Sequence, residues 1–348
     1  MRVASAQAAP AADVSPSSWP AAARAVALLT VAVSLLLTAF AWPSVRSSVH
    51  DVPIAVAGPA PAPAPAVEEL TAVLDRLLPG GFEVTEVADG AAAERLVRDR
   101  EVYGAIDLGS GTPQVLTASA ASTAVAQTLN SIAAGLDRAR GTGTAVVARD
   151  LVPLPAGDPR GAGLAAGALP LVMGGLLAAL VLTRLVRGST RRVTGACAFA
   201  VTGGLSVTAI LQFWLGALGG SYWADSGAVA LTIAATSLSI IGLVSVLGYV
   251  GFGIGAATMM LIGNPLSGTA TAPERLPGLS GALGQLLPPG AGGQLLRSTA
   301  FFDGQGAARP VVVLAAWLTL GMVLCLAGGL RARRAAAAVG DPAARATA

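Results

Sequence analysis

The chain of 348 residues contains no lysine, so all 22 of its basic residues are arginine, and it has a single histidine and two cysteines. The missing lysine excludes a phosphate-binding loop of the glycine-rich lysine type and every lysine Schiff base. A single histidine excludes a two-histidine zinc site. We therefore predict that the protein is not an enzyme, that it has no catalytic or cofactor-binding residues, and that it needs no cofactor or metal ion.

The neighbours of the only histidine resemble the members of a hydrolytic triad. Ser47, Ser48 and Asp51 lie beside His50 in one short segment. Adjacent residues of a linker cannot hold the fixed relay geometry that a triad requires. We interpret this group as part of a solvated linker.

The two cysteines, Cys197 and Cys325, both fall inside apolar stretches. The polar part of the chain therefore has no disulfide and must be stable through its own core. We interpret both cysteines as packing residues rather than as a redox or metal-binding pair.

Charged residues are also scarce, at 12% of the chain, whereas hydrophobic residues make up 54% and the mean hydropathy is +0.69. Soluble domains have about 25% charged residues. The net charge of +3 is modest, and the arginines cluster beside apolar stretches rather than along one stripe. This pattern argues against nucleic acid as a partner and indicates an integral membrane protein in the lipid bilayer.

Six strongly apolar stretches predict six membrane-spanning helices, since a span needs about 20 apolar residues. They are Ala25–Trp42, Gly163–Thr183, Val193–Gly219, Gly227–Gly248, Tyr249–Gly263 and Val311–Leu330. The fourth and fifth form one uncharged run of about 37 residues, which as a single helix would measure about 55 Å. We predict instead that this run folds as a tight hairpin.

The arginines predict the orientation, because cytoplasmic flanks carry the excess of positive charge. Arginines precede the first stretch, fill the link between the second and third, and follow the sixth; they are Arg24, Arg184, Arg187, Arg191, Arg192, Arg331, Arg333 and Arg334. All of them lie on one side if there are six crossings. We predict a multi-pass protein of the plasma membrane with both termini in the cytoplasm.

The predicted organisation is an α-helical membrane protein with an inserted extracytoplasmic α/β domain. Its parts are a disordered cytoplasmic N-terminus (1–20), helix 1 (21–42), the α/β domain (43–162), helices 2–5 (163–263), an extracytoplasmic re-entrant hairpin (264–309), helix 6 (310–330) and a cytoplasmic tail (331–348). The first helix has an alternative interpretation, because Ala39-Phe40-Ala41 resembles a signal-peptide cleavage site. We favour an uncleaved anchor, and the next block is exported in either case.

The polar block alternates between strand and helix patterns. Its predicted strands are Val52–Gly58, Phe82–Val87, Val102–Leu108, Gln114–Ala118 and Thr144–Leu154, and its predicted helices are Val67–Leu78, Gly90–Arg100 and Ser122–Arg140. A Pro/Ala connector, Pro59–Pro65, follows the first strand. The order is β-α-β-α-β-β-α-β, with Glu94 and Arg98 spaced for an ion pair on one helix face.

Glycine pairs inside the apolar stretches predict close helix packing. Gly163/Gly167, Gly216/Gly220 and Gly251/Gly255 have the four-residue spacing that lets helices approach closely in lipid. Gly251-x-Gly253-x-Gly255 superficially resembles a nucleotide fingerprint, but it has no strand before it. Pro170 is predicted to kink the second helix.

The loop from residue 264 to residue 309 has the most specific sequence. Asn264-Pro265-x-Ser267 and Leu287-Pro288-Pro289-Gly290-Ala291 are its two motifs. Together with Val52–Gly58 and Val102–Ala105, these motifs make the chain resemble the permeases of the type-two ABC exporter superfamily. The resemblance is greatest to an actinobacterial branch related to the phage-infection-protein (YhgE/Pip-like) group. It covers nearly the whole chain.

The resemblance implies a permease-like subunit that works as a homodimer with a separate ABC ATPase and exports a hydrophobic or lipid-linked substrate. Between Val193 and Gly219, and between Gly227 and Gly263, there is no carboxylate, histidine or arginine, so a charge relay within the membrane has no carrier. The alternative is a non-transporting envelope protein whose exported domain binds a partner, as a component of a secretion apparatus or as a surface receptor.

The same loop is predicted to be a re-entrant helical hairpin that closes the outer end of the helix bundle. Its apolar stretch, Leu279–Leu287, is too short to span a membrane and is bounded by prolines. The residues that we assign to this outer gate are Asn264, Pro265, Pro288, Gly290, Arg297 and Asp303. Arg297 and Asp303 are predicted to pair across a turn; the alternative is an ordinary exposed loop.

Overall fold

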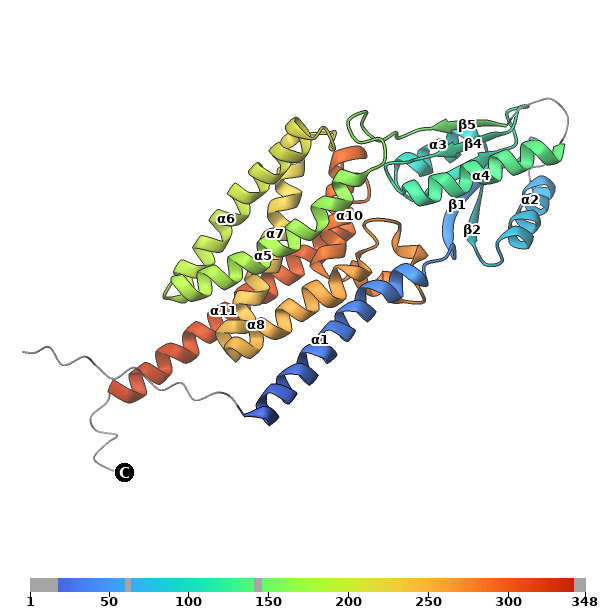
Figure 1. Ribbon diagram of the computed structural model, residues 1–348. Helices are drawn as coiled ribbons and strands as arrows, with labels where there is room; N and C mark the ends of the chain where they lie inside the picture. Colours follow the sequence, from blue (N-terminus) through green and yellow to red (C-terminus); the bar gives the residue numbers. More distant parts are fainter. Residues whose placement is uncertain (1–17, 60–63, 141–145, 341–348) are drawn as a thin grey trace, which may run out of the picture.

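A computed structural model describes residues 18–59, 64–140 and 146–340 as a helical bundle with a smaller α/β region at one end (Figure 1). The start of the predicted N-terminal segment, the middle of the Pro/Ala connector and the end of the predicted tail lie outside these residues. Within the described residues, five helices are long and apolar enough to cross a membrane. They are α1 (Trp19–Val45), α5 (Ala162–Leu185), α6 (Ser189–Ala209) with the π-helical turn η1 (Ile210–Trp214), α7 (Tyr222–Leu247) and α11 (Ala308–Gly340).

The remaining apolar stretch forms a shorter helical segment. It consists of α8 (Tyr249–Ala256) and the π-helical segment η2 (Ala257–Gly263). The chain reverses between α7 and α8 at Gly248, whose φ of +64° suits glycine. This reversal confirms the predicted hairpin. The segment rises only about 22 Å, however, whereas the hydrocarbon core of a bilayer is about 30 Å thick.

Helix α7 is the centre of the bundle and is buried along most of its length. Small hydroxyl side chains occupy many of its buried positions. Thr232 donates to the carbonyl of Ala228 at 2.8 Å, and Thr236 donates to the carbonyl of Thr232 at 2.9 Å. Because these hydroxyls bond to their own helix, they are buried without the cost of an unsatisfied polar group. Their small size leaves room for neighbouring helices.

The predicted glycine pairs have different outcomes. Gly251 contacts the backbone of Leu243, and a Cβ on Gly255 would lie 2.9 Å from Ile240 Cγ1, so this pair does pack α8 against α7. Gly163 contacts Ala217 and Gly167 faces Leu211.

The prediction that Gly216 and Gly220 form a packing pair on one helix is wrong. They follow the end of η1 in a loop, with φ values of +60° and +70°. They are turn residues rather than a pair on one helix, and Gly220 also approaches the carbonyl of Thr299 in α10.

Glycines outside the predicted pairs also bring helices of the bundle together. A Cβ on Gly204 of α6 would lie 2.7 Å from the carbonyl oxygen of Ser226 in α7. A Cβ on Gly242 of α7 would lie 2.6 Å from the carbonyl oxygen of Gly321 in α11. Gly328 of α11 meets Ser245 of α7 in the same way. Helices α6 and α11 thus approach the backbone of α7 directly.

The α/β region contains a five-stranded sheet of order β2-β1-β3-β4-β5. Its strands are β1 (Val52–Ala57), β2 (Phe82–Val87), β3 (Gly104–Asp107), β4 (Gln114–Thr117) and β5 (Val147–Asp150), and its helices are α2 (Ala64–Leu77), α3 (Gly90–Arg98) and α4 (Thr123–Arg140). Strand β1 is parallel to β2 and β3, β3 is antiparallel to β4, and β4 is parallel to β5. The predicted order of elements is confirmed.

The two faces of the sheet are covered by different helices, as the alternation of side chains along a strand requires. Ile54 and Val56 of β1 pack with Leu70 of α2 and Leu129 of α4 on one face. Ala55, from the same strand, packs with α3 on the other face. Alternating large apolar residues thus build a three-layer core.

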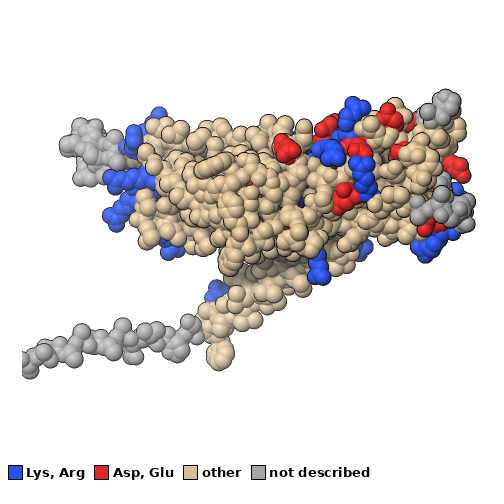
Figure 2. Space-filling view, turned by 90° about the horizontal axis from the view of Figure 1, so that it is seen from above, with Lys and Arg blue, Asp and Glu red and all other residues tan. Residues whose placement is uncertain are grey.

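The arginine-rich segments gather at the end of the bundle opposite the α/β region. The start of α1, the link between α5 and α6, the turn between α7 and α8, and the end of α11 all lie there (Figure 1). Figure 2 shows blue atoms at this end, a nearly uncharged middle, and mixed charges over the α/β region. Exposed Trp42, Trp214 and Trp223 lie near the other end of the apolar part, which is the distribution typical of a membrane interface.

Candidate functional site at the junction of the bundle and the α/β region

The predicted re-entrant hairpin, residues 264–309, forms four short helical segments. They are η3 (Pro265–Ser267), η4 (Pro273–Arg275), α9 (Ser280–Gln285) and α10 (Pro288–Phe301). Proline begins three of them, where its fixed φ suits the first turn and its missing N–H costs nothing. The apolar stretch Leu279–Leu287 accounts for α9 and its flanks. The prolines therefore divide this loop into short helices.

The hairpin folds tightly on itself through glycines. Gly284 contacts the carbonyl of Leu266, and Gly281 contacts the carbonyl of Pro273. Gly290, at the start of α10, contacts the carbonyl of Gly284. No side chain fits at these points without movement of the backbone.

Helix α10 then packs into the bundle. Gly292 contacts Thr232 of α7, and Leu295, Leu296 and Ala300 belong to the same buried apolar cluster as residues of α5, α7 and α11. The exposed-loop alternative is therefore wrong. The hairpin is a packed part of the bundle at the end that faces the α/β region.

The predicted gate residues lie in different environments. Asn264 follows η2, and its carbonyl accepts a hydrogen bond from the Ser267 hydroxyl at 2.8 Å. Pro265 begins η3, and Pro288 begins α10 in a buried position. Asp303 is exposed, with a φ of +50°, in the turn after α10. These residues share the hairpin but do not converge on one point.

The predicted pair between Arg297 and Asp303 is wrong. The exposed fraction of Arg297 is only 5%, and its Nη2 donates to the carbonyl of Thr269 at 2.8 Å. Within the described residues, the ion pairs that form join Glu94 to Arg98 and Arg149. The side chain of Arg297 turns inward because α10 presents this position to the hairpin core.

Arg297 is a buried cation. Burial is the main cause that lowers the pKa of its guanidinium to about 10; the neighbouring charge of Arg100 contributes to this lowering, whereas Tyr103 and Glu274 oppose it. At pH 7 the side chain remains protonated. A buried charge is tolerated when hydrogen bonds and an opposite charge compensate it. The carbonyl of Thr269 and the charge of Glu274 compensate Arg297 in part, while its Nε makes no hydrogen bond within the described residues.

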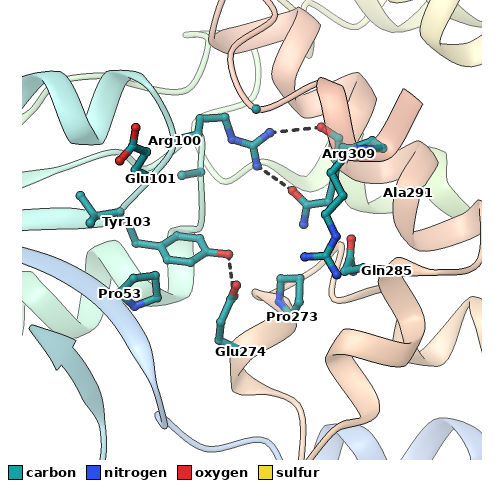
Figure 3. A pocket seen from close by; sticks show the side chains of 14 residues that line it. Pro53, Arg100, Glu101, Tyr103, Pro273, Glu274, Gln285, Ala291 and Arg309 are labelled. Atoms are coloured by element: carbon teal, nitrogen blue, oxygen red, sulfur yellow. Dashed lines mark hydrogen bonds between the residues drawn. The ribbon is translucent and has the colours of Figure 1, made fainter. Parts of the chain in front are cut away.

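Arg100 connects the α/β region to α10 (Figure 3). It follows α3 with a φ of +62°, which directs the chain toward β3. Its guanidinium donates to the carbonyl of Gln294 at 3.2 Å, to the side-chain Oε1 of Gln294 at 2.6 Å, and to the Ser298 hydroxyl. The guanidinium carbon also lies 5.1 Å from the centre of the Phe302 ring, in a cation–π arrangement.

Tyr103 and Glu274 form a second connection. The Tyr103 hydroxyl, just before β3, donates to Glu274 Oε2 of η4 at 2.6 Å. Burial raises the pKa of Tyr103 well above 10, and the charge of Glu274 raises it further. The proton therefore stays on the tyrosine, and the hydrogen bond is assisted by the carboxylate charge.

Two further hydrogen bonds fix the α/β region to the hairpin. The Ser122 hydroxyl, before α4, donates to the carbonyl of Thr271 at 2.6 Å. The backbone N–H of Ser48, between α1 and β1, donates to the carbonyl of Arg275 at 3.0 Å. The contacts on the α/β side come from three separate segments, which makes the junction a fixed interface rather than a flexible tether.

A cavity of about 190 Å³ lies within this junction. Arg100, Tyr103, Glu274 and Gln285 line it, and Arg309 extends into it from α11 (Figure 3). Its wall thus combines two cations (Arg100 and Arg309), two carboxylates (Glu101 and Glu274) and neutral polar groups. The cavity suits ordered water or a small polar solute.

A second cavity, of about 570 Å³, lies at the carboxyl ends of β1 and β3. Gly58, Asp107 and Gly90 line it, with Glu94 and Arg149 at its rim. Arg149 bonds Glu94 at 2.7 Å, whereas the predicted partner, Arg98, lies at 3.9 Å. In open α/β sheets the crevice outside the carboxyl ends of the strands is the usual place for ligands.

The cysteines and the histidine singled out in the sequence do not form a site with other side chains of the described residues. Among the described residues, no three metal-ligating side chains lie together. Cys197 is exposed and Cys325 is buried, and both are free thiols. His50 faces the Ser48 hydroxyl at 3.4 Å in the linker after α1.

No protein-family model, no curated protein and no solved structure matches the chain. Sequence reasoning identified the hairpin and Arg297 but missed Arg100, Tyr103 and Glu274 as junction residues. Tyr103 lies within the quoted Val102–Ala105 segment. No local pattern indicates that its partner is 171 positions away.

Proposed function

We propose that the chain is a permease-like subunit of an ABC-type exporter that moves a hydrophobic or lipid-linked substrate with a separate ATPase. In this proposal the chain crosses the plasma membrane six times, both termini are cytoplasmic, the α/β region is extracytoplasmic, and two copies form a homodimer. Segment α8–η2 is the fifth crossing, because it returns the chain from the arginine-rich end to the hairpin.

The observation that carries this proposal is the junction. Helix α10 packs against α7, and Arg100 bonds to α10 through Gln294 and Ser298. A displacement of α7 or α11 would therefore move the α/β region as well. Such a connection between spanning helices and an exported domain suits a protein in which a cytoplasmic ATPase drives a conformational change of the domain on the outer side of the membrane.

Copurification tests the proposal. The full chain is extracted from its native membrane in lipid nanodiscs, and the accompanying chains are identified. We expect a nucleotide-hydrolysing chain in fixed ratio and ATP hydrolysis by the complex. The chain purified alone is the control and should hydrolyse no ATP, since it lacks the phosphate-binding lysine. Recovery of the homodimer with no hydrolysing partner would contradict the exporter function.

The orientation has its own test. Single cysteines replace the exposed residues Ser110, Leu279 and Thr190 in a variant that lacks Cys197 and Cys325. An impermeant thiol reagent applied to intact cells should label positions 110 and 279 but not position 190. Labelling of position 190 alone would reverse the proposed orientation.

The alternative function is a non-transporting envelope protein whose exported domain binds a partner. Two observations favour it: the 570 Å³ cavity at the carboxyl ends of β1 and β3, and the link between α5 and α6, which is only Val186–Gly188. So short a link offers an ATPase little surface. Copurification of a secretion component or another envelope protein, lost in Arg149→Ala and retained in Arg76→Ala on the exposed face of α2, would support this alternative.

A further inference from the structure

The arginine-rich end of the bundle contains a large cavity that the proposed function does not use. It measures about 810 Å³ and lies between the α5–α6 link, the start of α6 and the last turns of α11. Volumes of about 300–1,000 Å³ are typical of sites for small organic ligands. Arg187, Arg191, Arg192 and Arg333 line one side of the cavity.

The charge around this cavity has one sign. The sequence has no acidic residue between Asp158 and Asp225, or between Asp303 and Asp341. Asp13 and Asp341 are the acidic residues nearest to the two chain ends, and both lie outside the described residues. Within the described residues, the ion pairs are those of Glu94 in the α/β region. Among the described residues, the guanidinium groups at the cavity therefore have no carboxylate partner.

The arginines at this end divide into two kinds. Arg192 donates to the carbonyls of Val186 at 2.8 Å and Thr183 at 3.0 Å, which satisfies the last turn of α5. Arg184 lies over the ring of Tyr249 at 5.0 Å. Arg187, Arg191 and Arg333 make no such contact with the described residues. These three cations are available to an anion.

The backbone at the start of α6 adds donors to the same cavity. Gly188 stands at the N-cap and supplies no side-chain acceptor, so the first N–H groups of the helix are uncapped. Unsatisfied N–H groups and the helix dipole favour an anion at this position. The Ser189 hydroxyl donates to the carbonyl of Cys325 at 3.1 Å and holds the start of α6 beside α11.

The opposite wall of the cavity is apolar. Met322 and Leu326 of α11 line it and are 37% and 68% exposed. Leu330, also in the lining, is 55% exposed. Because these side chains follow α11 toward the apolar middle of the bundle, hydrocarbon can enter the cavity from the side. A ligand for this site needs an anionic head and an apolar tail.

We propose that this cavity binds an anionic glycerophospholipid. Its phosphate contacts Arg187, Arg191 and the uncapped start of α6, and an acyl chain follows Met322 and Leu326. The inference uses the membrane location of the bundle but neither the transport function nor the ATPase, so either proposal can fail while the other stands.

Lipid binding to the full chain in detergent tests this inference. Native mass spectrometry and thermal unfolding are measured with phosphatidylglycerol, with phosphatidylcholine and with inorganic phosphate. We expect phosphatidylglycerol to bind at least tenfold more tightly than phosphatidylcholine. The double variant Arg187→Gln/Arg191→Gln should lose this preference. The control, Arg24→Gln/Arg334→Gln, removes the same charge from the same end outside the cavity and should keep the preference within twofold.

A second variant distinguishes the binding of the acyl chain from the binding of the phosphate headgroup. Leu326→Gln should weaken phosphatidylglycerol binding several-fold while leaving the weak binding of inorganic phosphate unchanged, since it alters only the apolar wall. Three results would overturn the inference: equal binding of the two lipids, an equal loss in the control pair, or competition by inorganic phosphate at the affinity of the lipid.

Discussion

The α/β region and the helix bundle expose opposite kinds of residue, and the bundle also buries hydroxyl side chains among its large apolar ones. In the sheet, Ile54 and Val56 have no exposed surface, while the charged residues of α3 point outward. In the bundle, Thr236 and Ser237 have no exposed surface, while Leu28 and Leu29 of α1 are 71% and 65% exposed. The difference teaches that one polypeptide folds against two solvents: water drives large apolar side chains inward, whereas in lipid small residues and close packing hold helices together.

We expect the largest effect on folding when a small residue inside the bundle is replaced by a large one. Gly242→Leu would place a side chain against the backbone of Gly321, so α7 and α11 would have to separate. We expect loss of folded protein, since overpacking costs about 1–3 kcal/mol or more even where side chains can adjust. Gly253→Leu is the control, because a Cβ there meets nothing within 4 Å. Size-exclusion profiles in detergent measure the outcome; equal profiles for both variants would contradict it.

In the α/β region the damaging change is the reverse, from large to small. Residues 44–159 should fold alone as a soluble fragment with a mixed helix and strand spectrum and a cooperative melt. In that fragment Ile54→Ala should lower the free energy of unfolding by about 2–5 kcal/mol, as measured by urea denaturation. Leu77→Ala, at a position that is 61% exposed, should change it by no more than about 0.5 kcal/mol. A random-coil spectrum of the fragment would make the region dependent on the bundle.

The junction mixes the two kinds of packing, so it should be sensitive to both kinds of change. Gly290→Leu should displace α10 from Gly284, and Arg297→Ala should leave the carbonyl of Thr269 without its donor. We expect Arg297→Ala to cost about 1–3 kcal/mol and both variants to open the hairpin to protease. Arg76→Ala, on the exposed face of α2, is the control. Unchanged thermal stability and protease resistance in both variants would show that the hairpin is not held by these contacts.

The effect that depends on pH concerns Tyr103. Its hydroxyl bonds to Glu274, so Tyr103→Phe should cost about 1.5–3 kcal/mol at neutral pH. Because the folded state raises the pKa of Tyr103 above 10, the tyrosine stabilises the fold fully below pH 10, and this stabilisation decreases as the pH rises above 10. The difference between wild type and Tyr103→Phe should therefore shrink at alkaline pH. If the difference in the free energy of unfolding between wild type and Tyr103→Phe is constant from pH 8 to pH 11, the proposed role of the tyrosine proton is wrong.

Much of the fold follows from local patterns. Alternating residues in Phe82–Val87 and the spacing of Leu70 and Leu74 are set by strand and helix geometry, so the sequence predicts these elements at nearly their observed bounds. Glycine spacing was less reliable: Gly216 and Gly220 have the right separation, but α6 ends in a π turn before them. A spacing rule applies only where the helix continues.

The long-range contacts of the site could not be predicted in the same way. Arg100 finds Gln294 across 194 positions, and nothing near either residue in the sequence indicates the other. The inward turn of Arg297 depends on the rotation of α10 within the hairpin, which a six-residue spacing to Asp303 does not reveal. Contacts of this kind are decided by how preformed elements dock.

The short segment α8–η2 has a consequence for how the protein is made. It carries no charged residue, it is separated from α7 by Gly248 alone, and Gly251 and Gly255 fit it against α7. About 15 residues are too few to partition into lipid well as an independent span. We therefore expect α7 to remain at the insertion machinery after it leaves the ribosome, until α8 emerges. The two helices then enter the bilayer as one paired unit. The re-entrant hairpin, residues 264–309, closes after them.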